Sequence, residues 1–125
     1  MVKNLKIYKN FNLTRKDKGT IILIGNFDGL HRGHQKLFNK AKSFKKKFKL
    51  RIGVITFDPI PKMFFKKLYN YRLSNFSQKI QLLKKKNVDF IINKKFNTKF
   101  SKINCFDFIK NILFKKIQPK YIFVS

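Results

Sequence analysis

Four short apolar runs separated by segments of helical spacing constrain the fold of this chain more than any other feature. Thr20–Gly25, "TIILIG", and Arg51–Phe57, "RIGVITF", have the continuous apolar character of strands that are buried on both faces. Val88–Ile92 and Tyr121–Val124 repeat the pattern. About 25 residues separate the first two runs, which is more than a parallel crossover requires. The sequence therefore predicts an α/β fold, with a parallel sheet and helices on both of its faces.

Three helices are expected to connect these strands. The first begins near Gly33 or His34, the second follows a cap at Ser74, and the third follows a cap at Asn104. No internal repeat or linker divides the chain, so residues 1–125 are expected to form a single domain, with a long connection over Lys62–Tyr71. The residues expected to face the core are Leu37, Phe38, Ala41, Phe44 and Phe48 in the first helix, Phe76, Ile80 and Leu83 in the second, and Phe106, Ile109 and Leu113 in the third.

The charge of the chain is strongly positive. Lysine and arginine number 31 against five aspartates and no glutamate, which gives a formal net charge of +26. Such a field attracts polyanions. The lysines are spread over every segment, however, and Lys, Asn, Phe and Ile are the residues of A/T-rich codons. We therefore favour compositional drift over a dedicated surface for a specific nucleic acid.

The cysteine content and the hydropathy pattern indicate the compartment. Cys105 is the single cysteine, so an internal disulfide is excluded and a reducing environment is expected. No apolar run approaches the length of a membrane span, and the first residues do not resemble a signal peptide. We expect a cytoplasmic protein that does not bind a membrane.

The stretch "IGNFDGLHRGHQKLF" follows the first predicted strand. In an open parallel sheet, ligands bind outside the carboxyl ends of the strands, near the point where the strand order switches. Gly25, Gly29 and Gly33 allow the backbone to turn and to approach a ligand closely, and the following helix presents its free N–H groups there. The stretch is neither a Walker A loop nor a dinucleotide fingerprint. It predicts a phosphate-binding site of another kind.

Two histidines, His31 and His34, lie three residues apart in this stretch. At that spacing both imidazoles can donate hydrogen bonds to one phosphate-bearing ligand. Phosphoryl and nucleotidyl transfer require positioning and charge neutralisation, which two histidines, a helix N-terminus and Mg²⁺ can supply. A zinc site is the alternative, but it lacks ligands, since Cys105 is distant and glutamate is absent. Histidines that merely decorate the start of a surface helix are a further alternative, which the spacing alone leaves open.

The segment "GNFDGLHRGHQKL" resembles the signature of the FMN adenylyltransferase module of the bacterial bifunctional riboflavin kinase/FAD synthetase family. Its H-x-G-H element is shared with the wider nucleotidyltransferase superfamily. "VITFDPIP" resembles the family's T-F-[DE]-P-H-P segment, with Ile60 in place of the histidine. "RLSNFSQKIQLLKKKNVDFII" and "KFNTKFSKINCFDFIKNIL" resemble two further family segments. The resemblance runs from about Thr20 to the last residue and implies a Rossmann-like nucleotidyltransferase sheet of the HIGH superfamily.

The resemblance implies that ATP and FMN react in the presence of Mg²⁺ to give FAD and pyrophosphate. His31 and His34 would be the catalytic pair that holds the ATP phosphates. The ATP site would also include Gly25, Phe27, Asp28, Gly29 and Gly33, and the flavin site would include Phe57, Asp58, Pro59 and Pro61. Another nucleotidyltransferase, such as one acting on pantetheine phosphate, is an alternative that the F-D-P-x-P segment disfavours, and a basic nucleic-acid-binding module is a third.

The resemblance ends before the family's module does. Beyond a strand like Tyr121–Val124 the family continues with a glycine, a D-F-x-F-G segment and an I-S-S-T-x-I-R motif, whereas here Ser125 stands in the position of the glycine. We likewise expect no riboflavin kinase domain in this module. We expect a truncated module, incomplete at the C-terminus, with low turnover if an arginine that neutralises the transition state is missing. Tyr121–Val124 is then an exposed apolar edge, where a second chain would complete the sheet.

Overall fold

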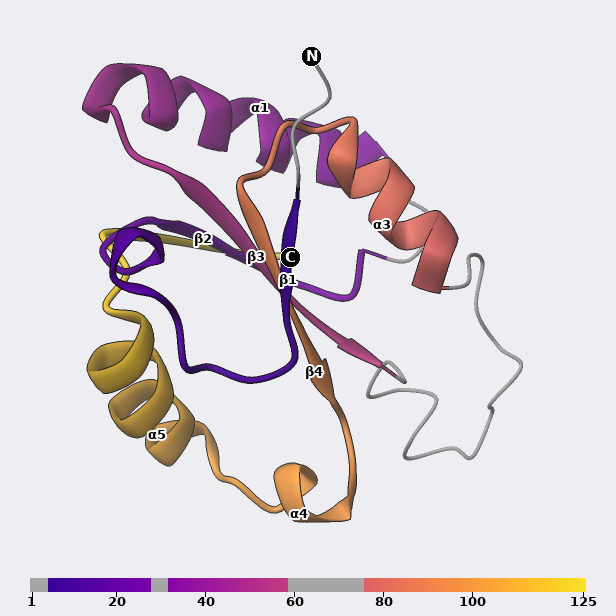
Figure 1. Ribbon diagram of the computed structural model, residues 1–125, viewed down its shortest axis with the longest axis vertical. Coiled ribbons are helices and arrows are strands. Elements are labelled where there is room, and N and C mark those ends of the chain that lie inside the picture. Colours follow the sequence, from indigo (N-terminus) through magenta and orange to yellow (C-terminus); the bar gives the residue numbers. More distant parts are fainter. Residues whose placement is uncertain (1–4, 28–31, 59–75) are drawn as a thin grey trace.

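The computed structural model describes residues 5–27, 32–58 and 76–125, and a single parallel sheet lies at its centre (Figure 1). The strand order is β1-β4-β3-β2-β5, and every neighbouring pair is parallel. The predicted α/β class is confirmed, and all four predicted strands are present. The strands are β1 (Lys6–Tyr8), β2 (Ile21–Ile24), β3 (Ile52–Asp58), β4 (Phe90–Lys95) and β5 (Tyr121–Val124).

Strand β1 was not expected from the sequence. It has three residues, of which only Tyr8 is buried, and it pairs with β4 at one edge of the sheet. Lysine is tolerated on an edge strand because its charged end remains in water. So short a strand leaves no apolar run in the sequence by which to find it.

Helices cover both faces of the sheet, as predicted (Figure 1). The helices α1 (Arg32–Phe48) and α3 (Phe76–Lys84) pack on one face, and the π-helix η2 (Phe108–Ile117) packs on the other. Because side chains alternate along a strand, β2 serves both cores, with Ile21 and Leu23 on the α1 side and Ile22 on the η2 side. Three short helical segments complete the described chain, namely η1 (Arg15–Asp17), α4 (Thr98–Ser101) and α5 (Cys105–Asp107).

The predicted core faces of the first two helices are largely confirmed. Phe38, Ala41 and Leu83 are buried, as is Ile80, while Leu37 and Phe44 pack against the same core from its border. Phe48 differs, because it lies at the end of α1 with 41% of its surface exposed and stacks on Tyr121 at a centroid distance of 5.1 Å. Ser74, the side chain of Phe76 and the predicted connection over Lys62–Tyr71 lie outside the described residues.

Of the inward residues predicted for the third helix, Leu113 is confirmed, whereas Phe106 and Ile109 are wrong. Asn104 does cap α5, since its Oδ1 accepts a hydrogen bond from the amide of Asp107 at 2.8 Å. Phe106 and Ile109, however, are 70% and 51% exposed. The chain continues into η2, whose i→i+5 hydrogen bonding widens each turn, so residues five apart share a face. The residues that are buried from η2 are Ile112, Leu113 and Ile117.

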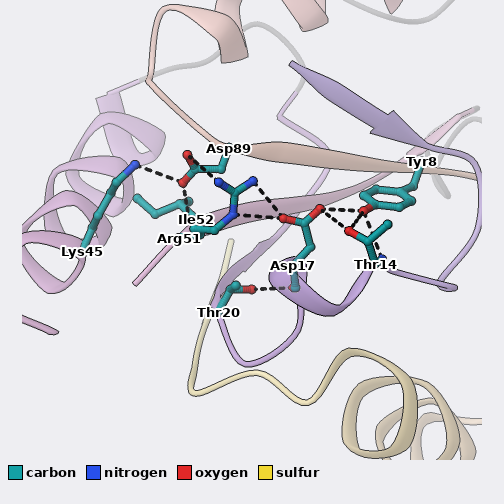
Figure 2. Close-up of polar contacts among 8 residues, drawn as sticks. All are labelled: Tyr8, Thr14, Asp17, Thr20, Lys45, Arg51, Ile52 and Asp89. Atoms are coloured by element: carbon teal, nitrogen blue, oxygen red, sulfur yellow. Dashed lines mark hydrogen bonds and ion pairs between the residues drawn. The ribbon is translucent and has the colours of Figure 1, made fainter. Parts of the chain in front are cut away.

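A polar network at the amino ends of β3 and β4 ties four segments together (Figure 2). Asp17 is fully buried and accepts from Arg51 through Nε at 3.1 Å and Nη2 at 2.9 Å, and from the hydroxyl of Tyr8. Asp89 accepts from Lys45 at 3.0 Å and from the first amide of β3 at 2.7 Å. These contacts fix the N-terminal segment and α1 against the sheet, at the end opposite to the glycine and histidine stretch.

Candidate active site

The sheet has a topological switch point between β2 and β5. From β2 the chain proceeds outward to β3 and β4, and it then returns to place β5 on the other side of β2. Ligands of open parallel sheets bind outside the carboxyl ends of the strands at such a point. The loop that begins at Gly25 leaves β2 there, and Ser125 follows β5 at the same edge. The amide of Ser125 donates to the carbonyl of Ile24 at 2.8 Å, which fixes the two ends together.

His34 lies in the first turn of α1 and faces this switch point. Only 7% of its surface is exposed. Its Nε2 lies 3.0 Å from Oγ of Ser125, so the imidazole is directed toward the end of β5. The N-terminus of a 17-residue helix and an imidazole are thereby placed at one point of the sheet edge. Both favour an anionic ligand.

The ring of Phe27 packs against the imidazole of His34. Its φ angle is 51°, a left-handed conformation that costs a bulky residue about 1–3 kcal/mol. The ring is fully buried, and its centroid lies 5.1 Å from that of His34 and 5.5 Å from that of Phe38. The loop is therefore bent so that Phe27 points into the core. The predicted contact between Phe27 and a nucleotide remains a prediction, and the ring as observed contacts protein.

Gly25 is explained by close packing at the end of β2. A Cβ atom at this position would lie 2.7 Å from Cβ of Ser125, closer than real Cβ atoms approach, and 3.1 Å from the ring of Phe27, which is a tight contact. Its amide donates to the carbonyl of Ile55 at 3.1 Å, which holds the loop against β3. Gly33 lies exposed in the first turn of α1.

Phe57 and Asp58 end strand β3 at the same edge of the sheet, and both are partly exposed. The ring of Phe57 packs against Phe96 and Phe100, at centroid distances of 5.9 and 5.8 Å. The predicted flavin contact of these two residues remains a prediction. The other site residues expected from the sequence, Asp28, Gly29, His31, Pro59 and Pro61, lie outside the described residues.

Two buried polar residues near this edge were missed by sequence reasoning. Lys79 of α3 is 5% exposed, and its Nζ donates to Oγ1 of Thr56 at 3.0 Å. Thr56 in turn donates to the carbonyl of Asn26, in the loop after β2, at 3.0 Å. The available signal was the position of Lys79 directly before Ile80 and four residues before Leu83, on the apolar side of the helix.

The arrangement is suited to binding an anion. An imidazole, a helix N-terminus and a buried lysine lie at the carboxyl edge of the sheet, and all of them can donate hydrogen bonds. Within residues 5–27, 32–58 and 76–125, no three His, Cys, Asp or Glu side chains come together in a group that would hold a metal ion.

The fold and the H-x-G-H element at its switch point define a Rossmann-like α/β protein of the nucleotidyltransferase superfamily. Residues 13–125 match the sequence model of the family described as FAD synthetase, and the chain belongs to this family. The resemblance inferred from the sequence is thus confirmed.

Individual relatives agree with this assignment. The chain is 38% identical over 115 residues to a bifunctional riboflavin kinase/FMN adenylyltransferase from Buchnera aphidicola subsp. Acyrthosiphon pisum (strain APS). That match covers 91% of this chain and 37% of the relative, so the chain spans little more than a third of the relative's length.

Two solved structures share the fold. One is described as a macrolide-efflux protein from Streptococcus pneumoniae, with a TM-score of 0.78 and 25% identity over 99% of this chain and 41% of that one. The other is a pantoate-beta-alanine ligase from Francisella tularensis complexed with a β,γ-ATP analogue and β-alanine, with a TM-score of 0.53 and 25% identity over 90% and 46% of the two chains. Among the described residues, no helix is both long and apolar enough to cross a bilayer.

Proposed function

We propose that this chain binds ATP and FMN at the switch-point edge and transfers the adenylyl group of ATP to FMN. An oxygen of the FMN phosphate attacks the α-phosphorus of ATP. The bond from this phosphorus to the oxygen bridging to the β-phosphate breaks, so that FAD forms and pyrophosphate leaves. The observation that carries the proposal is the position of His34, which lies in the first turn of α1 with Nε2 directed at the end of β5. Membership of the FAD synthetase family supports the identity of the substrates.

We assign the roles from the order of the residues in the sequence. His34, together with His31, donates hydrogen bonds to the ATP phosphates and neutralises the charge that develops on the leaving pyrophosphate. Gly25, Asp28, Gly29 and Gly33 are assigned to the nucleotide, and Phe27 holds the imidazole of His34 in place. Phe57 and Asp58, which end β3, and Pro59 and Pro61, which come next in the sequence, are assigned to the flavin.

The described residues can accommodate a Mg²⁺ ion that is bound to ATP. Asp58 is the carboxylate that the described part of the chain places at the carboxyl end of β3. Mg²⁺ commonly keeps several waters and binds through one or two carboxylates together with substrate phosphates, so it does not require a cage of protein ligands. When bound, it would neutralise charge on the triphosphate.

Strand β5 forms one edge of the described sheet. In the described chain β5 pairs with β2 alone, and Ile122 and Val124 are 43% and 69% exposed. We propose that a strand of a second chain pairs with Tyr121–Val124 and covers these side chains.

Cys105 is exposed and unpaired, which supports a cytoplasmic location.

The experiment that tests the function measures FAD formation from FMN and ATP with Mg²⁺, followed by chromatography. His34→Ala and His31→Ala are compared with Asn39→Ala, which changes an exposed residue of the same helix. We expect FAD from the unaltered chain and from Asn39→Ala, and at least about a tenfold loss in each histidine variant, the loss expected when a charged hydrogen bond is removed. Binding of neither ATP nor FMN by the unaltered chain, measured by calorimetry, would contradict the proposal.

A further inference from the structure

Lys79 is a buried lysine that the proposed roles above do not use. It belongs to α3 and is 5% exposed. Lysine is rarely buried to this extent, because removing an ammonium group from water is costly unless the group is paired and hydrogen-bonded. On the same helix, Ile80 and Leu83 enter the apolar core that α1 and α3 share. The chain therefore carries a charged side chain at the border of a core.

Two hydrogen bonds of Lys79 reach the end of strand β3. Its Nζ lies 3.0 Å from Oγ1 of Thr56, which is fully buried, and 3.5 Å from the carbonyl oxygen of Phe57. The hydroxyl hydrogen of Thr56 is used toward the carbonyl of Asn26, at 3.0 Å, so Thr56 accepts from Lys79 with a lone pair. The order of donation is Lys79 to Thr56 to Asn26.

These contacts join the two segments that carry the two proposed substrates. Asn26 lies after β2, between Gly25 and Phe27 of the proposed nucleotide site. Phe57 lies at the end of β3 and is itself one of the proposed flavin-site residues. The two strands are neighbours, with Ile24 paired to Ile55, so their carboxyl ends lie side by side. Lys79 approaches both ends from α3.

Stability alone does not explain a lysine at this position. Whole buried ion pairs can often be replaced by well-packed apolar residues without loss of stability, so folding does not in general require a charge at such a position. Methionine has nearly the length of lysine and would continue the apolar face formed by Ile80 and Leu83. In contrast, two phosphate groups that react with each other repel, and a positive charge where they meet lowers that repulsion.

We propose that Lys79 is a positioning residue. It fixes Asn26, after β2, relative to Phe57, at the end of β3, and it lowers the repulsion between the FMN phosphate and the ATP phosphates. The inference rests on the proposed function. It predicts that Lys79 contributes to affinity when both substrates are bound, and not when either one is bound alone. Thr56 transmits the contact to Asn26.

The test measures FMN affinity in the presence and absence of α,β-methylene-ATP, which binds as ATP does but cannot transfer its adenylyl group. Lys79→Met is compared with Lys79→Arg, Thr56→Val and the control Lys84→Met, which changes an exposed lysine of the same helix. Riboflavin, which lacks the phosphate, replaces FMN in a parallel series. The melting temperature of every variant is recorded.

We expect Lys79→Met to change the affinity for FMN alone less than threefold, whatever its effect on the melting temperature. With the ATP analogue present, its FMN affinity falls at least tenfold, and this loss is absent with riboflavin. Lys79→Arg retains at least a third of the original affinity, and Lys84→Met is unchanged. Thr56→Val keeps the charge but not the link to Asn26, and its loss is intermediate. This variant serves as the test should Lys79→Met not fold.

Equal affinity of the unaltered chain and Lys79→Met for FMN in the presence of the analogue would overturn the inference and leave the proposed function standing. A lowered melting temperature with unchanged affinities would assign Lys79 a structural role and overturn it as well. If the unaltered chain binds neither FMN nor the analogue, the proposed function fails and the inference fails with it.

Discussion

Nε2 of His34 lies 3.0 Å from the hydroxyl of Ser125, although 91 positions separate the two residues in the chain. The contact crosses the switch point of the sheet, from the first turn of α1 to the end of β5. The resemblance to the FMN adenylyltransferase module leads one to expect glycine where Ser125 stands. The serine side chain also lies against Gly25, where a Cβ would meet it at 2.7 Å. In this chain the imidazole of His34 therefore has a hydroxyl partner, which a glycine at position 125 would not provide.

Removing that hydroxyl should strengthen the binding of ATP. A phosphate oxygen that binds Nε2 of His34 must take the place of Oγ of Ser125, so Ser125→Gly and Ser125→Ala remove a competitor. Because a neutral hydrogen bond contributes about 0.5–1.5 kcal/mol, we expect both variants to bind ATP about 2- to 10-fold more tightly by calorimetry. Weaker binding in both would instead assign Ser125 to orienting the imidazole.

Gly53→Ala should destabilise the fold. A Cβ at Gly53 would lie 2.1 Å from Cζ of Phe90, whose ring is fully buried on the adjacent strand. Displacing a packed ring in this way costs about 1–3 kcal/mol of unfolding free energy, which urea denaturation would measure. Adding Phe90→Leu should recover part of the loss. No change in Gly53→Ala would mean that the ring moves without cost.

Asp17→Asn should also destabilise the protein. Asp17 is fully buried and accepts two hydrogen bonds from Arg51, whose side chain is 37% exposed (Figure 2). The amide keeps the shape but loses the charge and part of the acceptor capacity, at a cost of about 1–3 kcal/mol in urea denaturation. Asp107→Asn, at an exposed aspartate, is the control and should change stability by less than about 0.5 kcal/mol.

A charge on the free edge should suppress self-association. Val124 of β5 is 69% exposed at the edge where the described chain provides no further strand. We expect the unaltered protein to associate at high concentration, and Val124→Lys to remain monomeric in light scattering, because an edge charge opposes strand pairing. Phe106→Lys, at an exposed aromatic residue outside the sheet, should leave the association unchanged. A monomeric unaltered chain at high concentration would contradict the expectation.

The central part of the fold was predictable from the sequence because its signals are strong. Strands β2 and β3 are buried on both faces, so their residues form uninterrupted apolar runs. β1 has one buried residue and no such run. In η2 the outcome depended on the hydrogen-bonding pattern, because Ile109 fits an α-helical face with Leu113 that the π-helix does not form.

The sequence indicates a candidate site where its signals are local. The glycines and histidines of one stretch are assigned to a phosphate site from their spacing and from the resemblance to a family, and this assignment stays a prediction. The contact of His34 with Ser125 joins distant segments, and no local pattern encodes it. Lys79 was hidden for a different reason. In a chain with 31 lysines and arginines, the sequence does not distinguish one buried lysine from the many exposed ones.

The pairing of β1 with β4 fixes an order of assembly during synthesis. Each residue of β1 pairs with a residue 84 positions further along, as Lys6 does with Phe90. At a translation rate of about 5–20 residues per second, the first strand leaves the ribosome several seconds before its partner exists. Among the described strands, β2 and β3 can pair before β4 has been made, whereas β1, which precedes them in the chain, stays without its sheet partner until β4 is complete.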